Sequence, residues 1–465
     1  MTLAGFVAVV AGMGLAQALA GAVLVGRFAA AATTSSAERD CVAVGLRPGT
    51  PGTPALSGAA ADRDDQPPIT ILKPLHGDEP LLEPALASVC AQDYQRFQVV
   101  FGVQDAADTA LPVVARIRAR FPQCDIAVVV DPAQHGANRK VGNLINMLPR
   151  AKHAVLVIAD SDLHVQPDYL ARLAAALAEQ GTGLVTTLYT GLPAANRLAQ
   201  LLGAMQITHY FLPGALLARA MRRQDCLGAT MVLRRATLDR IGGLQALVGH
   251  LADDQVLGRR VLALGLAVRL AATVPATTVP EVRLRDLLRH ELRWARTIRA
   301  LEPGAFAASV LQYPLFWAAL ALLLSGGAAW SFGVFFLAWV ARAIAAIWID
   351  RALEPLLIPV AEPGARPALG PRVRRADRGG GGRTPDDLRL EDAMNLADAA
   401  SQGLAFPCPV WLLPFRDLIS VGVMLASYAG RRVEWRGEYL TADTPGRAAP
   451  GLTSPEGPPP SERPT

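Results

Sequence analysis

The first residues of the chain form a continuous apolar stretch. No charged residue occurs from Thr2 to Val25, and Arg27 is the first charged side chain after it. A helix of about 20 apolar residues crosses the hydrocarbon core of a bilayer. A cleaved signal peptide would need a basic segment before a shorter apolar one, and this pattern is not present. Residues 1–31 are therefore predicted to form an N-terminal transmembrane anchor.

A region of short, β-rich apolar runs follows a flexible linker predicted at 32–68, which is rich in Ala, Ser, Thr, Gly and Pro. Helical patterns, such as those at 81–90 and 169–178, separate the runs. The predicted strands are Ile69–Leu72, Phe97–Val103, Ile126–Val130, Val155–Ile158 and Leu184–Leu188. This alternation predicts an α/β domain over 69–301 with a mainly parallel sheet that is covered by helices on both faces. Its ligands are expected at the carboxyl ends of the strands.

The chain becomes apolar again after the α/β region. Two transmembrane helices are predicted within 302–350, followed by a basic, partly disordered loop at 351–403. A third apolar segment at 404–430 carries Arg416 and Asp417 near its middle. A charged pair costs a few kcal/mol when it faces lipid, so these two residues should pair, face protein or lie in a re-entrant segment. The tail at 431–465 is Pro-rich and predicted to be mostly disordered.

The distribution of basic residues predicts the orientation of the chain. Basic residues favour the cytoplasmic side, which places Arg27, the α/β domain and the basic loop there. A third complete span would put the basic residues that follow residue 430 on the opposite side. Residues 404–429 are therefore predicted to form a hairpin or an interfacial segment that returns to the cytoplasmic side.

Composition excludes several classes of protein. The 465 residues include 45 basic and 40 acidic side chains, but only 18% are charged and 51% are hydrophobic. No block of Lys and Arg is interleaved with aromatic residues, so a nucleic-acid partner is not expected. This composition also excludes a wholly disordered, collagen-like or disulfide-stapled chain. The five cysteines are scattered and form no CxxC motif, which argues against a zinc site and favours a reducing compartment.

Two carboxylates directly follow a predicted buried strand. Asp160 and Asp162 end the apolar run that begins at Ala154. A pair of acids at a strand end is able to hold a hard divalent cation, and the cation is able to bridge the phosphates of a nucleotide diphosphate. The spacing alone is weak, since Asp62 and Asp64 have the same spacing in the predicted linker. Helix capping is the alternative role for this pair.

Two further segments suit a nucleotide diphosphate. Asp105 follows another predicted strand and is able to accept hydrogen bonds from a base or a ribose; a turn or cap role is equally open. Asn138, Arg139 and Lys140 lie just before a helical pattern, where backbone N–H groups and cations favour anions. The alternative for this segment is a solvated loop.

Asp253 and Asp254 open another helical pattern. Adjacent acids are common as caps at a helix N-terminus. In a cleft, one such acid is able to remove a proton from an acceptor hydroxyl group. These two residues are candidate catalytic acids.

A basic amphipathic pattern precedes the apolar C-terminal half. It contains His290, Arg293 and Trp294. His290 or Arg293 is placed to offset charge on a leaving phosphate, and Trp294 to stack on an acceptor ring. A plain membrane-interface helix is the alternative.

The order of these motifs resembles membrane-bound glycosyltransferases of the ceramide glucosyltransferase type, which have a GT-A fold (glycosyltransferase family 2/21 type). The resemblance covers residues 69 to about 301. Within that type, the sequence is most similar to the hopanoid-biosynthesis-associated branch. The motifs that carry the resemblance are Lys73–Gly77, Gly102–Asp105, Gly136–Lys140, Asn143–Met147, Asp160–Asp162, Ala252–Asp254 and His290–Trp294.

The resemblance implies a role for each motif. Asp105 would bind the uridine, Asp160 and Asp162 would bind the diphosphate through Mg²⁺ or Mn²⁺, and Asp254 would be the catalytic base. His290, Arg293 and Trp294 would form the (Q/R)xxRW element of the family, although His replaces Gln or Arg at its first position. That difference argues against a processive polysaccharide synthase.

The expected activity is transfer of N-acetylglucosamine from a UDP-sugar to a bacteriohopanetetrol-type lipid, at the cytoplasmic side of a bacterial inner membrane. Two alternatives stay open at the level of sequence. The chain could transfer glucose to ceramide, or it could be a catalytically silent membrane scaffold.

Overall fold

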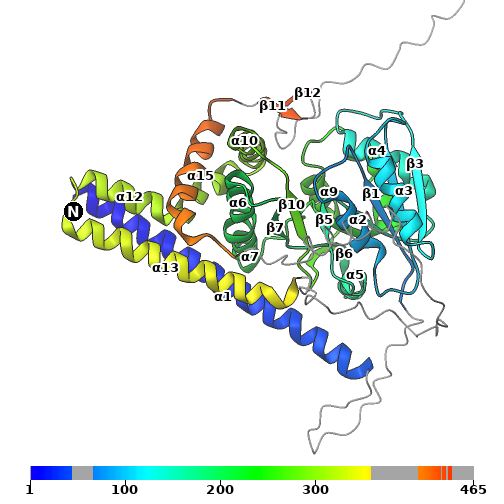
Figure 1. Cartoon of the computed structure of the whole chain (residues 1–465), viewed down its shortest axis with the longest axis horizontal. Helices are drawn as coiled ribbons and strands as arrows, with labels where there is room; N and C mark the ends of the chain where they lie inside the picture. Colours follow the sequence, from blue (N-terminus) through cyan, green and yellow to red (C-terminus); the bar gives the residue numbers. More distant parts are fainter. Residues whose placement is uncertain (1, 44–65, 358–406, 431, 436–437, 442–465) are drawn as a thin grey trace, which may run out of the picture.

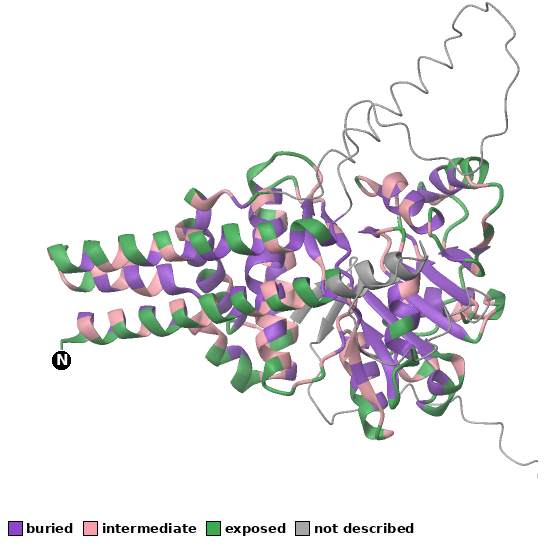
Figure 2. Cartoon of the chain, turned by 90° about the horizontal axis from the view of Figure 1, so that it is seen from below, coloured by how far each residue is buried: buried purple, intermediate pink, exposed green. Residues whose placement is uncertain are grey.

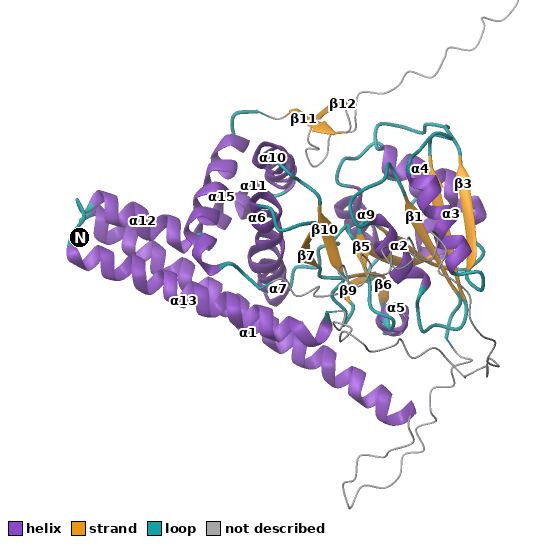
Figure 3. Cartoon of the chain, viewed as in Figure 1, coloured by secondary structure: helices purple, strands orange, loops and turns teal. Residues whose placement is uncertain are grey.

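The computed structural model describes residues 2–43, 66–357, 407–430, 432–435 and 438–441. Most of the predicted linker, the basic loop and the tail lie outside these residues. Figure 1 shows two parts of the molecule: an α/β domain on one side, and long helices that extend away from it and include the N-terminus. Figure 3 shows that the strands gather in the first part.

A seven-stranded sheet forms the centre of the α/β domain. Its order is β3-β2-β1-β4-β8-β6-β9, and all neighbours are parallel except β8, which runs antiparallel to β4 and β6. The strands are β1 (Ile69–Pro74), β2 (Phe97–Val103), β3 (Asp125–Val130), β4 (Val155–Ala159), β6 (Thr182–Thr186), β8 (Thr230–Arg234) and β9 (Ala267–Leu270). The predicted α/β class and mainly parallel sheet are confirmed.

Helices cover both faces of this sheet. Accordingly, every residue of β4 and all but the last residue of β1 are buried, and most of these side chains are apolar. Ile71 belongs to the core on one face and Leu72 to the core on the other. The first face packs against α2 (Leu82–Cys90), α3 (Ala110–Arg120) and α5 (Tyr169–Ala178). The second face packs against α4 (Arg139–Met147), α8 (Arg235–Arg240) and α9 (Asp253–Ala263). Short 3₁₀ turns are η2 (Leu148–Arg150) and η4 (Leu244–Ala246).

A small second sheet lies beside the end of β4. Its order is β5-β10-β7, and its strands are β5 (Leu163–His164), β10 (Ala276–Val279) and β7 (Thr190–Pro193). The chain enters β5 directly after Asp162. The second sheet therefore holds the segment that carries the two predicted metal ligands.

Two helical segments connect the sheets to the apolar part of the molecule. The first consists of α6 (Leu198–Gln206), the π-helical turn η3 (Ile207–Phe211) and α7 (Leu212–Ala220). The second is α10 (Leu284–Leu301), which leads into α11 (Pro303–Ala308) and η5 (Ser309–Gln312). In Figure 1 these helices lie between the sheets and the long apolar helices.

Three apolar helices pack side by side away from the sheets. They are α1 (Leu3–Ala43), α12 (Pro314–Leu324) and α13 (Ala329–Leu353), which is followed by η6 (Glu354–Leu356). Large apolar side chains such as Phe6, Phe336 and Leu337 are exposed on them, and Figure 2 shows exposed positions along their outer faces. An exposed apolar surface of this extent is typical of contact with lipid.

Four helical segments of the described chain are long and apolar enough to cross a membrane. They cover residues 3–33, 198–220, 329–356 and 410–427, and a fifth span is possible if the pair at 303–312 and 314–324 counts as one. That pair is bent by 67°, so the first predicted span after the domain is broken. Residues 198–220 were not predicted as a span, and 61% of their most apolar stretch is buried.

The third apolar segment is one helix, so the predicted hairpin is wrong. The turn η7 (Val410–Leu412) continues into α15 (Leu413–Ser427), without a reversal, and α15 contacts α6, α10 and α12. In Figure 1, α15 runs across the direction of α1 and α13, and the hairpin of β11 (Arg432–Trp435) and β12 (Glu438–Thr441) follows it. Arg416 and Asp417 are fully buried. They face protein, which was one of the three expected outcomes, and an interfacial position for the helix stays a prediction.

Candidate active site

Three of the predicted site residues follow strands at one edge of the large sheet, and five lie at the starts of helices. Asp160 and Asp162 follow β4, and Asp105 follows β2, which is separated from β4 by β1. Lys140 lies in the first turn of α4, and Asp254 lies in the first turn of α9. Because β1, β2 and β4 are parallel, their carboxyl ends meet at the same edge.

Lys140 and Lys73 hold Asp160. The Lys140 ammonium lies 2.5 Å from a carboxylate oxygen of Asp160, and 36% of the Asp160 side chain is exposed. Lys73 is completely buried at the end of β1 and donates a hydrogen bond of 2.6 Å to the backbone oxygen of Asp160. Burial lowers the pKa of Lys73 to about 8, against the attraction of Asp162 and Asp160. The loop after β4 is thus fixed by one lysine at its backbone and one at its side chain.

Asp162 is fixed by the second sheet. Thr277 donates a hydrogen bond of 2.6 Å to one carboxylate oxygen, and the backbone N–H of Thr278 donates to the backbone oxygen of Asp162. Burial and the nearby charge of Asp160 raise the pKa of Asp162 to about 7. The two acids therefore lie close enough to repel each other.

Asp253 and Asp254 bring a second pair of acids to Lys140. Asn138 donates a hydrogen bond of 3.2 Å to Asp253, which is buried. Burial, followed by the charge of Asp253, raises the pKa of Asp254 to about 7. The charges of Asp160, Asp253 and Asp254 all favour the charged form of Lys140, and its pKa rises. Three acids from two distant parts of the chain thus surround Lys140, and Asp162 lies beside one of them.

Gly228 allows the carboxylate of Asp254 to lie against the backbone. A Cβ atom at this position would lie 2.9 Å from Oδ2 of Asp254, which is closer than ordinary packing permits. Any larger residue would have to push the Asp254 side chain away.

Tyr189 links the acids to the helix that carries the predicted aromatic element. Burial raises the pKa of Tyr189, and the charges of Asp254, Asp160 and Asp162 raise it further. The same ring packs, together with Trp294, against a small core of Ala204, Ile207 and Val279. Trp294 therefore packs against the same small core as Tyr189, whose pKa the acids raise.

His290 and Trp294 lie on one face of α10. Their ring centroids are 4.4 Å apart, as expected for residues four apart on a helix. Nδ1 of His290 lies 2.5 Å from a carboxylate oxygen of Glu281, and His290 and Arg293 lower the pKa of Glu281. The side chains of His290 and Arg293 thus both act on the carboxylate of Glu281.

Asp105 is not part of the cluster of four acids. It is exposed, and its side chain accepts a hydrogen bond from the N–H of Ala107 in its own turn. Asn138 is 1% exposed and caps α4, with its amide donating to His250 and Asp253. Its side chain therefore orders the loop, while Arg139 and Lys140 remain the cationic part of the segment.

Four residues to which the sequence analysis assigned no role complete the cluster. Lys73 and Thr277 hold Asp160 and Asp162, the acids raise the pKa of Tyr189, and Glu79 accepts a hydrogen bond of 2.7 Å from Ser161. Only Lys73 could have been found from the sequence, because it directly follows a predicted apolar strand. A buried ammonium group needs a polar or charged partner, so its position there indicates one nearby. The other three come from loops and strands whose position depends on the tertiary structure.

Asp160 and Asp162 supply only two of the ligands that a divalent cation needs. The described residues contain no group of three or more His, Cys, Asp or Glu side chains that could hold a metal ion. Two oxygen-bearing acids that repel each other are suited to a hard cation whose other ligands come from phosphate and water. The residues present therefore fit a metal that arrives with a diphosphate.

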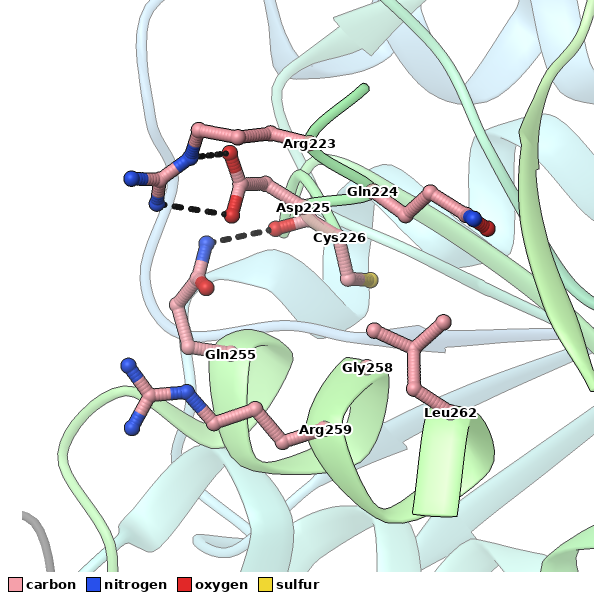
Figure 4. Close-up of a pocket in the computed structure, with 8 residues that line it drawn as sticks. All are labelled: Arg223, Gln224, Asp225, Cys226, Gln255, Gly258, Arg259 and Leu262. Atoms are coloured by element: carbon pink, nitrogen blue, oxygen red, sulfur yellow. Dashed lines mark hydrogen bonds and ion pairs between the residues drawn. The ribbon is translucent and has the colours of Figure 1, made fainter. Parts of the chain in front are cut away.

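A cavity of about 220 Å³ lies beside α9. Figure 4 shows Gln255, Gly258, Arg259 and Leu262 of that helix facing the segment from Arg223 to Cys226. None of the predicted site residues lines it. Its charged groups are already paired, since Arg223 bonds to Asp225 and Arg259 to Glu302.

Comparison with known protein families gives a match that covers most of the chain. Residues 6–367 match the model "Glycosyl transferase family 21". Ceramide glucosyltransferase 3 of Caenorhabditis elegans is 20% identical over 252 residues, which are 53% of this chain and 54% of that protein. An N-acetylglucosaminyltransferase of Mesorhizobium japonicum is 26% identical over 260 residues, which are 52% of this chain and 59% of that protein. The chain thus spans little more than half the length of these relatives.

Solved structures with a similar arrangement are more distant. A mannosyltransferase from Pyrobaculum calidifontis, in complex with GDP-Man and Mn²⁺, has a TM-score of 0.41 and 19% identity, over 86% of this chain and 99% of that one. Glucosyl-3-phosphoglycerate synthase from Mycobacterium tuberculosis, in complex with Mn²⁺ and UDP, has a TM-score of 0.34 and 18% identity, over 54% and 85% of the two chains.

Proposed function

Because the chain belongs to glycosyl transferase family 21, we propose that it is a membrane-bound inverting glycosyltransferase that moves a sugar from a UDP-sugar to a lipid hydroxyl group. The α/β domain has the GT-A fold. One observation carries the proposal: Asp160, Asp253 and Asp254 meet around Lys140, with Asp162 beside Asp160, in a molecule with several apolar helices. The charged cluster suits a donor that carries a negative diphosphate, and the apolar helices suit an acceptor with an apolar body.

The donor diphosphate would bind at the end of β4. Asp160 and Asp162 would hold Mg²⁺ or Mn²⁺, which supplies positive charge to the diphosphate when bound. Lys140 and Arg139 lie at the start of α4, where cations and backbone N–H groups favour phosphate. The uridine role of Asp105 rests on the family resemblance, and its exposed position leaves it accessible to a base or ribose.

Asp254 would act as the general base. A carboxylate whose pKa is about 7 is half ionised at neutral pH and is suited to accept a proton. The acceptor oxygen would form a bond to C1 of the sugar on the face opposite the diphosphate. The bond from C1 to the UDP oxygen would break with its electron pair, and the hydroxyl proton would move to Asp254. The sugar would be inverted at C1, and UDP would leave as an anion near Lys140.

The lipid acceptor would approach along α10 and the helix formed by α6, η3 and α7. Both contact apolar helices, and Trp294 of α10 packs against the same small core as Tyr189, whose pKa the acids raise. A ring of Trp294 would stack on the polar head of the acceptor. The catalytic domain would lie at the cytoplasmic face of a bacterial inner membrane, as the basic residues predict.

The acceptor that we favour is a bacteriohopanetetrol-type hopanoid, with N-acetylglucosamine as the sugar. The motifs support this acceptor through their resemblance to the hopanoid-associated branch. A relative named as an N-acetylglucosaminyltransferase supports the sugar. The second candidate is ceramide with glucose, which is favoured by the relatives named ceramide glucosyltransferase.

Product mass separates these candidates. Membranes containing the full chain would be incubated with UDP-N-acetylglucosamine or UDP-glucose, and with bacteriohopanetetrol or ceramide, in the presence of Mg²⁺ or Mn²⁺. We expect an N-acetylglucosaminyl hopanoid, and none from membranes that contain Asp254→Asn. Glucosylceramide alone would favour the second candidate. Absence of any glycolipid and of metal-dependent UDP release, in protein that is folded, would contradict the proposed enzyme and favour the silent scaffold.

A further inference from the structure

A buried ion pair joins α15 to α10. Arg416 of α15 is fully buried, and its two terminal nitrogens donate hydrogen bonds of 2.8 and 2.6 Å to the two carboxylate oxygens of Glu291. Glu291 is 7% exposed. This two-point contact, which we name the α10–α15 clasp, is the most geometrically specific form of an ion pair.

The guanidinium of Arg416 is satisfied by three helices at once. Its remaining N–H groups donate to Ser420 in α15 and to the backbone oxygen of Leu202 in α6. The clasp therefore sets the position of α10 relative to α6 as well as α15.

Glu291 lies beside the proposed site without being part of it. It directly follows His290 in α10, so its side chain is turned by about 100° around the helix axis. Glu291 and Ala295 face α15, where Ala295 packs with Val421 and Met424. His290 and Trp294 form the neighbouring face. A rotation of α10 would therefore move both faces together.

Apolar packing also contributes to the orientation of α10, because Leu287 packs in a core with Leu202, and Trp294 packs against Ala204. At the contact with α15, the apolar partner is the small residue Ala295. A buried ion pair contributes little net stability compared with apolar side chains of similar size. Its role in some proteins is instead to favour one conformation over others. The clasp adds a directional polar contact between α10 and α15, and its two-point geometry favours one orientation of α10.

We propose that Glu291 and Arg416 are positioning residues that hold α10 so that His290, Arg293 and Trp294 face the acids of the sheet edge. This inference rests on the proposed glycosyltransferase function. It gives the C-terminal apolar helix a part in the active site, although no residue of α15 needs to touch the substrate.

The test uses the full chain in nanodiscs and compares four variants with the wild type. Arg416→Met breaks the clasp and leaves Glu291 buried without its partner. The double variant Glu291→Leu with Arg416→Met removes both charges, so it keeps an apolar contact and avoids the cost of a lone buried charge. The double variant Glu291→Arg with Arg416→Glu reverses the pair. Asp417→Asn is the matched control, because Asp417 is equally buried in α15 but bonds to Tyr210 and Leu315 rather than to α10.

The expected result distinguishes an effect on the orientation of α10 from an effect on the stability of the protein. The apolar double variant should unfold at the temperature of the wild type or above it, yet its kcat should fall roughly 10- to 100-fold, as for a misplaced catalytic group. Its KM for the UDP-sugar should stay unchanged, since the donor contacts lie on other elements. The reversed pair should recover part of the lost kcat, and Asp417→Asn should keep kcat in the folded fraction. Amide hydrogen exchange should increase in residues 284–301 of the apolar double variant and stay unchanged in β1 and β4.

Two results would overturn the inference. One is a wild-type kcat in the apolar double variant, which would make the pair purely structural. The other is an equal loss in Asp417→Asn, which would assign the effect to α15 as a whole. If the wild type itself makes no glycolipid, the proposed function fails; hydrogen exchange in α10 still reports on the clasp, and unchanged exchange would reject it independently.

Discussion

Charged residues are removed from water in two regions of the molecule, the edge of the large sheet and the apolar helices. At the sheet edge, four aspartates gather around Lys140 and Lys73, and the pKa values of Asp162 and Asp254 both rise to about 7. Around α15, every N–H group of Arg416 has an acceptor, and both oxygens of Asp417 have donors.

The difference between these regions teaches where chemistry is to be expected. A buried charge is costly unless it is paired and hydrogen-bonded. The charges around α15 meet that condition within the protein, as expected of residues that hold helices together. The acids at the sheet edge are not all paired in this way, because negative charges lie next to one another there. Such unbalanced sites are common where a cation or substrate supplies the missing charge.

The largest expected effect is that of Asp254→Asn. Loss of the proposed base should reduce transfer by about 10²- to 10⁴-fold, the usual contribution of a general base. Binding of the UDP-sugar, measured by calorimetry, should persist. Retained turnover would remove Asp254 from the base role.

The same substitution should stabilise the folded protein at high pH. The pKa of Asp254 is raised in the folded state, so its ionisation costs stability as the pH rises from about 4 through about 7. At pH 8 and without donor or metal, Asp254→Asn should therefore unfold at a higher temperature than the wild type. A lower unfolding temperature would show that the carboxylate is not strained by its neighbours. Lys152→Ala, at an exposed ion pair with Asp125, serves as the control.

Asp162→Asn should have the second largest effect. Removal of one proposed metal ligand should reduce transfer about 10²-fold at fixed Mn²⁺ and raise the metal concentration needed for half-maximal rate. A titration of rate against Mn²⁺ measures both. An unchanged metal requirement would exclude Asp162 as a ligand.

The pH dependence of transfer should reflect the base. Below pH 7, protonation of Asp254 should lower kcat about tenfold for each unit of pH, and above pH 7 the rate should level off. A rate profile between pH 5 and 9, with protein folding checked at each pH by circular dichroism, tests this. A rate that is flat down to pH 5 would contradict the raised pKa.

Gly228→Ala should cause the smallest of these losses. The added Cβ would crowd Oδ2 of Asp254 at 2.9 Å and displace it by a fraction of an ångström. We expect kcat to fall roughly tenfold with little change in the KM for the donor. Gly249→Ala, where a Cβ atom would have no neighbour within 4 Å, is the matched control and should keep the wild-type rate. Equal rates in both variants would show that the position of Asp254 is tolerant.

Much of the α/β domain followed from local pattern. The predicted strand at 97–103 and helix at 169–178 have the observed bounds, and the strand at 155–158 differs by one residue. These elements are apolar runs of the length and composition that a two-sided parallel sheet requires. Residues 404–429 were predicted to form a hairpin or an interfacial segment. The described part is one helix rather than a hairpin, and its partner Glu291 of α10 could not be identified from the distribution of basic residues. The interfacial position stays a prediction.

The sequence by itself determined which residues end strands or begin helices, and so it identified Asp160, Asp162 and Asp254 as candidates. It also determined that apolar helices accompany the domain. The ends of strands and helices, and the apolar character of a helix, depend on residues that are close together in the sequence. Only the tertiary structure decided that Lys140 lies beside Asp160 and Asp254 and that Tyr189 and Trp294 pack against one small core. The same is true of Arg416 and Glu291, which are 125 residues apart along the chain. Contacts over such separations depend on how whole helices and sheets pack, and no local pattern contains that information.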